Sequence, residues 1–261
     1  MPRPRRPALA VLLAALTLTA GCSFLASNPE SYTSTYEYSV GVDATGTLSD
    51  VTIRVPLPQR DGDVVVGADA IAPNDTVDGM DAAVVDTEYG PMLELTAETF
   101  VVETRYFRVV EADGMGRREK IDESEYDPTN PDHQEVSRRT VTVSVTRTAA
   151  YPIETRAPVG ASPTFVPDAT RELTECPFPY RDETACFAYD APVYLSYESS
   201  SSTRVSGVVA VYGSNEWFAG GWTSNGYSDR VKFAATGPRG GWVVANGTTE
   251  VGRGTYPSPE P

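Results

Sequence analysis

Apolar and polar residues alternate one by one along much of this chain, which is the pattern of β-strands with one buried face. The clearest alternation runs from Tyr32 to Val42, and it recurs at Val51–Leu57 and Val141–Val145. Further apolar runs cover residues 193–197, 205–212, 230–235 and 242–245, and no segment keeps apolar residues at helical spacing. The expected fold is all-β: an antiparallel β-sandwich or a barrel-like domain with long irregular loops.

Local residue choices sharpen this expectation. Tyr89-Gly90-Pro91 separates two apolar stretches and predicts a hairpin. Pro56 and Pro58 cannot donate ladder hydrogen bonds, so the strand that ends there is expected at the end or edge of a sheet. The run Thr99–Glu111 lacks clean alternation, which predicts a strand with both faces buried. Turn composition, expected between strands, occurs at Ser199–Ser202, Gly213–Asn215, Asn225-Gly226 and Gly237-Pro238.

Two stretches interrupt the strand pattern. Residues 112–139 are polar and densely charged, and they form either a long excursion from one sheet or a link between two subdomains. Residues 157–189 are rich in proline and contain Cys176 and Cys186. On the outer side of a membrane such a pair is expected to form a disulfide that closes the proline-rich loop, and a thiol or metal pair is the alternative.

The first residues carry the features of an export signal. Three arginines (Arg3, Arg5 and Arg6) precede an almost wholly apolar run, Ala8–Ala20, that is too short for a comfortable membrane span. Thr19-Ala20-Gly21-Cys22 resembles a lipobox, in which the signal is cut before the cysteine and lipid is joined to its thiol, although Thr19 replaces the usual bulky aliphatic residue. An ordinary signal with an incidental cysteine, or an uncleaved anchor, is the alternative.

These features divide the chain into four parts. They are a signal peptide (1–21), a tether (22–31), a β-rich extracytoplasmic domain (32–256) and a disordered tail (257–261). Attached through a lipid on Cys22, the protein is expected on the outer face of the cell membrane. The Arg5-Arg6 pair leaves both the general secretory route and the twin-arginine route open.

The charge balance excludes nucleic acid as a partner. The chain has 36 acidic and 21 basic residues, which gives a net charge of −15, whereas a phosphate backbone requires a basic face. Removal of the three signal arginines makes the mature charge −18. An acidic chain with only two lysines is typical of proteins from extreme halophiles, where molar salt screens the repulsion. An acidic exoprotein of a mesophile is the alternative.

Four segments carry a resemblance to known proteins. They are TAGC (Thr19–Cys22), TEYGPML (Thr87–Leu93), NEWFAGGW (Asn215–Trp222) and DRVKFAATGPRGGWV (Asp229–Val243). In them the chain resembles an uncharacterised secreted lipoprotein family of halophilic archaea, over essentially the whole mature part. The resemblance implies the location and a β architecture. It implies no activity, so no catalytic residue follows from it.

Candidate catalytic and metal-binding groups are few. The single histidine, His133, lies in a polar segment expected to be a solvated loop, and no G-x-S-x-G elbow is present. A group of carboxylates that could ring a calcium ion does not have the spacing of an EF-hand loop; it comprises Asp122, Glu123, Glu125, Asp127 and Asp132. No metal and no cofactor are therefore expected.

Aromatic residues crowd a stretch rich in glycine and asparagine, at Trp217, Phe218, Trp222 and Tyr227. They form either a binding surface for a glycan or protein partner, or a plug at the end of a β domain. Asn74 and Asn246 each begin a sequon for N-glycosylation.

The leading interpretation is a non-enzymatic, lipid-anchored protein that binds or scaffolds an unknown protein or glycan partner at the cell surface. It depends on the lipobox, the strand-rich body and the missing nucleophile constellation. A surface hydrolase that uses carboxylates or a metal is the alternative.

Overall fold

A computed structural model describes residues 33–66, 76–77, 79–112, 115–177, 184–218 and 220–256, and nearly all of their regular structure is β. The first strands are β1 (Thr33–Ala44), β2 (Leu48–Pro56), β3 (Gln59–Arg60), β4 (Asp63–Val64), β5 (Thr76–Val77), β6 (Met80–Thr87), β7 (Gly90–Phe100), β8 (Thr104–Ala112) and β9 (Met115–Ile121). A 3-10 helix, η1 (Glu123–Glu125), precedes β10 (His133–Ser137), β11 (Arg139–Ala149), β12 (Glu172–Thr174), β13 (Ala185–Glu198), β14 (Arg204–Phe218), β15 (Trp222–Thr236) and β16 (Arg239–Gly254). The expected all-β fold is confirmed.

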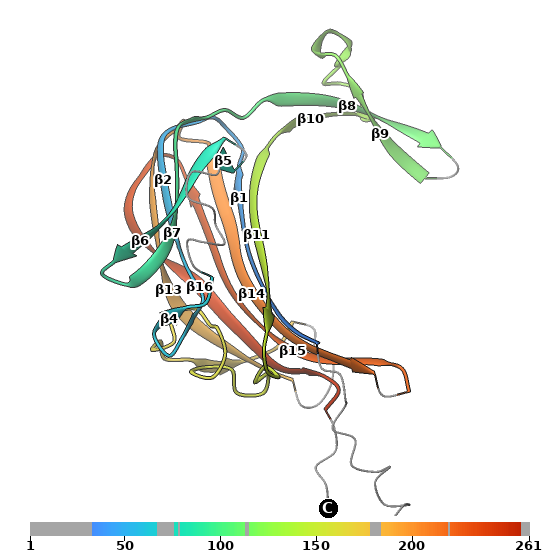
Figure 1. The fold of residues 1–261 in the computed structure, drawn as a ribbon. Helices are drawn as coiled ribbons and strands as arrows, with labels where there is room; N and C mark the ends of the chain where they lie inside the picture. The colour runs from blue at the N-terminus through green and yellow to red at the C-terminus, as the bar shows by residue number, and fades with distance from the viewer. Residues whose placement is uncertain are drawn as a thin grey trace, which may run out of the picture.

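Eleven of the strands form one antiparallel sheet. Its order is β11-β1-β14-β15-β16-β13-β2-β7-β6-β5, and β12 pairs with β13 off this path. The sheet curls so strongly that β5, at one end of this order, contacts β11 at the other (Figure 1). A single sheet wrapped around one core corresponds to the barrel-like alternative rather than to a two-sheet sandwich.

The inner face of the curl follows the alternation in the sequence. In β1, Tyr38, Val40 and Val42 are buried, while the residues between them are less so. Equivalent inward positions of the other strands join the same core, among them Ile53, Val55, Leu93, Leu95, Val193, Leu195, Val209, Val211 and Val231. Burial of each such side chain contributes about 1.5–3 kcal/mol, so this inner face is the main stabilising feature of the fold.

The segment between β11 and β12 covers part of this core. Phe165 is fully buried and meets the ring of Tyr38 edge to face, with the centroids 6.2 Å apart. Its N–H donates to Oδ2 of Asp229 at 2.7 Å, and its carbonyl accepts from Nη2 of Arg171 at 2.8 Å. An irregular segment is therefore fixed to the sheet by buried polar groups.

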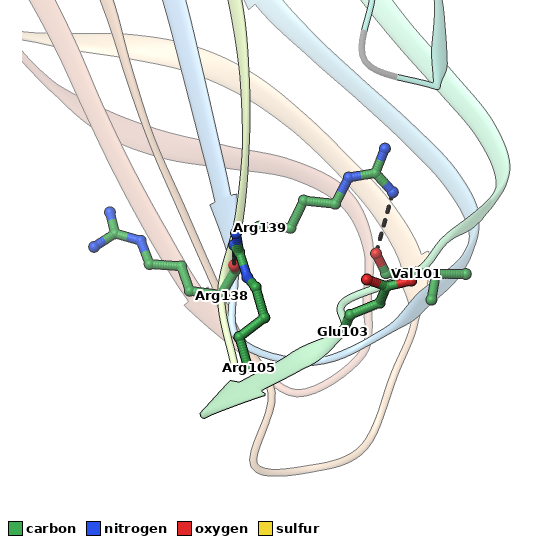
Figure 2. Close-up of a pocket in the computed structure, with 5 residues that line it drawn as sticks. All are labelled: Val101, Glu103, Arg105, Arg138 and Arg139. Atoms are coloured by element: carbon green, nitrogen blue, oxygen red, sulfur yellow. Dashed lines mark hydrogen bonds between the residues drawn. The ribbon is translucent and has the colours of Figure 1, made fainter. Parts of the chain in front are cut away.

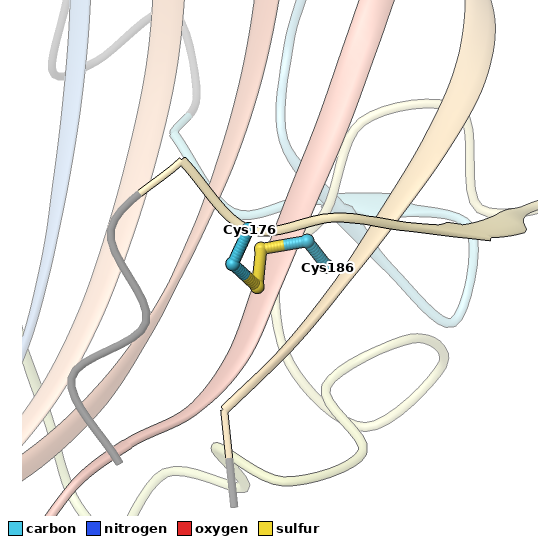
Figure 3. Close-up of a disulfide and its surroundings, with 2 residues drawn as sticks. All are labelled: Cys176 and Cys186. Carbon is cyan, nitrogen blue, oxygen red and sulfur yellow. A yellow bond between two sulfur atoms is a disulfide. The ribbon is translucent and has the colours of Figure 1, made fainter. Parts of the chain in front are cut away.

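The expected disulfide between Cys176 and Cys186 is confirmed. The two Cα atoms lie 5.3 Å apart, and the bond joins the chain after β12 to the start of β13 (Figure 3). Strand β2 pairs with β13 only from Tyr194 onward, whereas β12 pairs with Cys186–Ala188. The disulfide therefore holds a short strand against the part of the β13 edge that β2 does not cover.

Two strand predictions are wrong. Strand β2 is not at an edge, because it pairs with both β13 and β7. Its pairing with β13 ends at Arg54, so Pro56 lies where no donor to that neighbour is needed. The run Thr99–Glu111 is divided between β7 and β8, and its apolar residues in β8 are only half-buried because β8 has left the main sheet.

Two of the predicted turns are also wrong. Gly213–Asn215 lies within β14 and Asn225-Gly226 within β15, and the two segments pair with one another. Glycine is needed at 213 for space, since a Cβ there would overlap the ring of Tyr227. The asparagines are buried and hydrogen-bonded, so they have no need of a solvent-exposed turn. The Tyr89-Gly90-Pro91 hairpin, in contrast, is confirmed as the β6–β7 turn.

Residues 101–138 leave the main sheet after β7 and return to it with β11 (Figure 1). They contain a three-stranded antiparallel sheet, in the order β10-β8-β9, that extends away from the curled sheet (Figure 1). We call residues 101–138 the arm. Among its described residues only Ile121 is buried, so the arm has almost no core of its own.

Candidate functional site

A cavity of about 420 Å³ lies where the arm joins the main sheet. Residues from both connecting segments, from the start of β8 and from the start of β11 line it: Val101, Glu103, Arg105, Arg138 and Arg139 (Figure 2). Three arginine residues therefore border one cavity on a strongly acidic chain, although the side chains of Arg138 and Arg139 point in opposite directions (Figure 2).

Each of these arginines ties one chain segment to another. Nη1 of Arg139 donates to the carbonyl of Val101, and Nη2 of Arg105 donates to the carbonyl of Arg138, both at 3.1 Å. The Arg138 guanidinium pairs with Asp43 of β1 through two bonds, Nε to Oδ1 at 3.0 Å and Nη2 to Oδ2 at 2.5 Å. The base of the arm is thus clamped to the main sheet.

The pairing with Arg138 also sets the ionisation of Asp43. The hydrogen bonds from Arg138 hold the pKa of the Asp43 carboxyl below its usual range, and the hydroxyl of Thr140 acts in the same direction. The guanidinium of Arg139 lies over the ring of Phe100, with 4.4 Å between its central carbon and the ring centroid. The three guanidinium groups thus bind groups of the protein itself, and Glu103 adds a carboxylate to the lining of the cavity.

One face of the arm continues from this cavity. Residues paired across an antiparallel sheet share a face, which places Arg105, Phe107, Val109 and Glu111 of β8 beside Gly116, Arg118 and Lys120 of β9 and Gln134 and Val136 of β10. We call these nine residues the basic face. None of them is buried, and three cations stand on it against one carboxylate.

The opposite face of the arm packs on itself. The rings of Tyr106 and Tyr126 lie 4.7 Å apart, and Tyr126 stacks on His133 at 6.2 Å. Ile121 is buried on this side, opposite Tyr106 in the register. The basic face has no comparable cover among the described residues, and its apolar side chains remain half-exposed.

The expectation of a solvated loop for His133 is wrong. This residue begins β10 and is half-buried. Its Nδ1 accepts the N–H of Asp127 at 2.9 Å, so the ring fixes the return of the chain from η1 to β10.

The five carboxylates of the 122–132 segment are all exposed. Those of Glu125 and Asp127 bond locally, to the N–H of Asp122 at 3.1 Å and to the N–H and hydroxyl of Thr129 at 2.8 and 2.7 Å. These bonds from Thr129 lower the pKa of Asp127. In the part of the chain that the structure describes, no three His, Cys, Asp or Glu residues are grouped so that they could hold a metal ion.

The structure separates the four aromatic residues of the predicted surface. Trp217 and Tyr227 are buried, and the Tyr227 hydroxyl donates to the carbonyl of Pro163 at 2.6 Å. Phe218 and Trp222 are 59% and 79% exposed, and they face each other across the end of the β14–β15 hairpin with ring centroids 6.0 Å apart. The stretch thus supplies both a core and an exposed aromatic pair.

The remaining candidate residues are dispersed. Asn246 is exposed in the middle of β16, far in sequence from the other sequon. Cys22 and Asn74 lie outside the described residues. Asn246 does not line the cavity at the base of the arm.

Sequence reasoning did not single out the arginine cluster, although a signal for it is present. Seven of the 21 basic residues fall between positions 105 and 139. The same segment also holds many acids, so its average composition conceals the separation of the charges onto different faces. The separation follows from strand register, which the composition does not contain.

Comparisons with known proteins do not identify the chain. No protein-family model, curated protein or solved structure matches it. In the described ranges, none of the helices has the length and apolar character that crossing a membrane requires.

Proposed function

We propose that this protein is a lipid-anchored extracytoplasmic binding protein, and that the basic face of the arm contacts an acidic protein partner at the cell surface. The observation that carries the proposal is this uncovered face, where Phe107, Val109 and Val136 lie among three cations on a chain of net charge −15. Arginine next to apolar side chains is typical of protein interfaces, whereas a glycan would offer the apolar residues little to bury against.

The energetics of the arm support a role in binding. The three-stranded sheet of the arm has one buried side chain among its described residues and so gains little from hydrophobic burial. The arm therefore contributes little to the stability of the main sheet. The arginines at its base nevertheless hold it in place. A pre-ordered surface loses less entropy when it binds, which favours a recognition element over an incidental loop.

The direction of the arm supports the same proposal. Strand β1 begins at Thr33, next in the sequence to the tether, and its other end, Ala44, pairs with Arg139 at the base of the arm. Twelve strand residues separate these ends by about 36 Å. A chain anchored through Cys22 would therefore be attached at the end of β1 that is remote from the arm.

Site-specific photo-crosslinking from position 109 in native cells tests the partner. We expect a crosslink to a protein with an acidic surface, and we expect Arg118→Glu to abolish it. Arg117→Glu is the matched control, because it makes the same change in charge at the neighbouring residue on the opposite face. A crosslink that survives Arg118→Glu, or one that captures only glycan, would contradict the proposal.

Cell fractionation tests the anchor independently. The wild-type chain should partition with membranes and the Cys22→Ser chain should be released. If both chains remain equally membrane-bound, an uncleaved signal rather than a lipid holds the protein.

The hydrolase alternative needs a carboxyl group of shifted pKa that a substrate can reach, and Asp229, whose pKa burial raises, is completely enclosed. A cavity of about 660 Å³ beside β13 and β16 has Asp168, Glu172 and Asp190 in its wall, but all three are exposed to solvent. General acid–base catalysis by a carboxyl group requires a neighbour or a dry wall that shifts its pKa. We therefore do not propose this activity.

A further inference from the structure

The β14–β15 hairpin ends in an exposed aromatic pair. Phe218 and Trp222 pair in the strand register, are mostly exposed and pack edge to face. From Asn215 to Ser224 the chain carries one charged residue, Glu216, in a protein in which 22% of residues are charged. An exposed aromatic pair in a segment with a single charge is an unusual surface for an acidic protein, and exposed apolar surfaces often mark a contact with a partner or a membrane.

This tip lies where the chain enters the fold. Thr33, the first described residue, pairs with Glu216, two residues before Phe218. Tyr151, which is 81% exposed, follows β11 just after Ala149, the partner of Ser34. Figure 1 places the β14–β15 hairpin at one end of the molecule and the arm at the other. Exposed aromatic residues thus lie just beyond the positions of both strands that pair with the start of β1.

The hairpin that carries the tip is fixed at its base. Asn215 and Asn225 are buried and joined by a hydrogen bond of 2.8 Å across the two strands. Oδ1 of Asn215 also accepts the N–H of Ile153 at 2.7 Å, and Trp217 is buried between these residues and the tip. Phe218 and Trp222 therefore project from an ordered strand pair.

The length of the tether limits where the tip can lie. From Cys22 to Thr33 the chain advances eleven residues, which span at most about 40 Å even when fully extended. A lipid on Cys22 would hold Thr33 within this distance of the bilayer, and the tip lies two strand positions beyond the partner of Thr33. Aromatic rings are stable at the level of the lipid headgroups, where they bury apolar surface next to water.

We propose that Phe218 and Trp222 insert into the headgroup region of the membrane and orient the protein with its arm directed outward. This inference rests on the proposed lipid anchor at Cys22 for its proximity to the membrane. The contact is apolar, so molar salt should not release it.

The first test uses the full mature chain with Cys22→Ser, so that no lipid is attached, and phosphatidylcholine vesicles in about 2 M KCl. Loss of both aromatic side chains in Phe218→Thr/Trp222→Thr should weaken sedimentation with the vesicles at least about tenfold. Val208→Thr/Val244→Thr is the matched control, because these valines are exposed in other parts of β14 and β16. Equal partition of the two variants would overturn the inference.

The second test uses the lipidated protein in vesicles whose acyl chains carry bromine near the headgroup. Tryptophan emission should be quenched, and Trp222→Phe should remove most of the quenching while Trp242→Phe retains it. Quenching that is unchanged in Trp222→Phe would overturn the inference and leave the anchor intact. A native protein whose Cys22 carries no lipid would overturn the anchor alone, since the first test uses a chain without lipid.

Discussion

The side-chain amide of Asn215 donates to Oδ1 of Asn225, 2.8 Å away on the neighbouring strand of the same hairpin. Both residues are buried, and both also bind main-chain atoms of segments that cross the end of the sheet. Asn215 accepts from the N–H and donates to the carbonyl of Ile153, and Asn225 donates to the carbonyl of Thr255. Two asparagines thus satisfy the polar groups of irregular chain at this end of the core.

Replacement of Asn215 by alanine should destabilise the protein strongly. The change leaves the N–H and carbonyl of Ile153 and the hydroxyl of Ser34 without their partner in a buried site, and we expect a loss of about 2–4 kcal/mol in the free energy of unfolding. Denaturant titration in molar salt measures it. Ser214→Ala, which removes a part-buried hydroxyl contact to Thr35, should cost less than about 1 kcal/mol. Equal losses for the two variants would contradict this reading of the network.

Asp229 predicts a pH dependence of stability. This carboxyl group is completely buried, and burial raises its pKa from 3.8 to about 6, against the effect of donors that include Phe165, Tyr189 and Arg171. Between pH 3.8 and about 6, the folded state therefore binds a proton at Asp229 that the unfolded state has released. The contribution of Asp229 to the free energy of unfolding is therefore complete below the lower value and is lost as the pH rises to about 6.

Unfolding titrations of the wild type and Asp229→Asn across this window measure the effect. The stability of the wild type relative to the variant should fall as the pH rises, because the amide does not titrate. Subtracting the free energy of unfolding of the variant from that of the wild type cancels the contributions of other titrating groups. Asp43 is one of them, and its lowered pKa changes stability with pH in the opposite direction. A difference that stays constant with pH would show that Asp229 does not titrate in this range.

The disulfide should stabilise the edge of β13. By the chain-entropy model, closing a loop of this length contributes about 2–3 kcal/mol, and Cys176→Ala/Cys186→Ala should lose that amount. Denaturant titration with and without reductant measures it. Reductant should destabilise the wild type to about the level of the variant and leave the variant unchanged. A wild type that is indifferent to reductant would contradict the assignment.

The class of the fold follows from the sequence because alternation is a local property of each strand. Tyr38, Val40 and Val42 repeat with period two and are buried together. The extent of the strands does not follow in the same way. Gly213 has turn composition, yet it lies in β14 because the ring of Tyr227 occupies the space where a side chain would be. Such a requirement depends on a residue of the next strand.

The candidate sites differ in the same way: a feature that is local in the chain can be predicted from the sequence, and one that depends on strand pairing cannot. Cys176 and Cys186 are close in the chain, and their bond could be predicted from that proximity and from the expected compartment. The basic face depends on which of two neighbours, Arg117 or Arg118, shares a face with Val109. A shift of one residue in the register would exchange them, and composition does not determine the register.

Salt should have a large effect on stability. The net charge of −15 places many carboxylates near one another, and the repulsion opposes the compact state at low ionic strength. The Debye length falls from about 10 Å at 0.1 M to about 3 Å at 1 M, so the melting temperature should rise substantially between about 0.1 M and about 3 M KCl.

A variant separates this repulsion from other effects of salt. Asp81, Asp86, Glu88 and Glu98 are exposed on or beside the β6–β7 hairpin, and their replacement by Asn and Gln removes four negative charges and alters no buried residue. The rise in melting temperature should become smaller in this variant, mainly through a higher value at low salt. Any strengthening of hydrophobic burial by KCl would remain, since it depends on apolar area rather than charge. A melting temperature that is constant across the range in the wild type would contradict the halophilic interpretation, because the acidic surface would then carry no measurable penalty in dilute buffer.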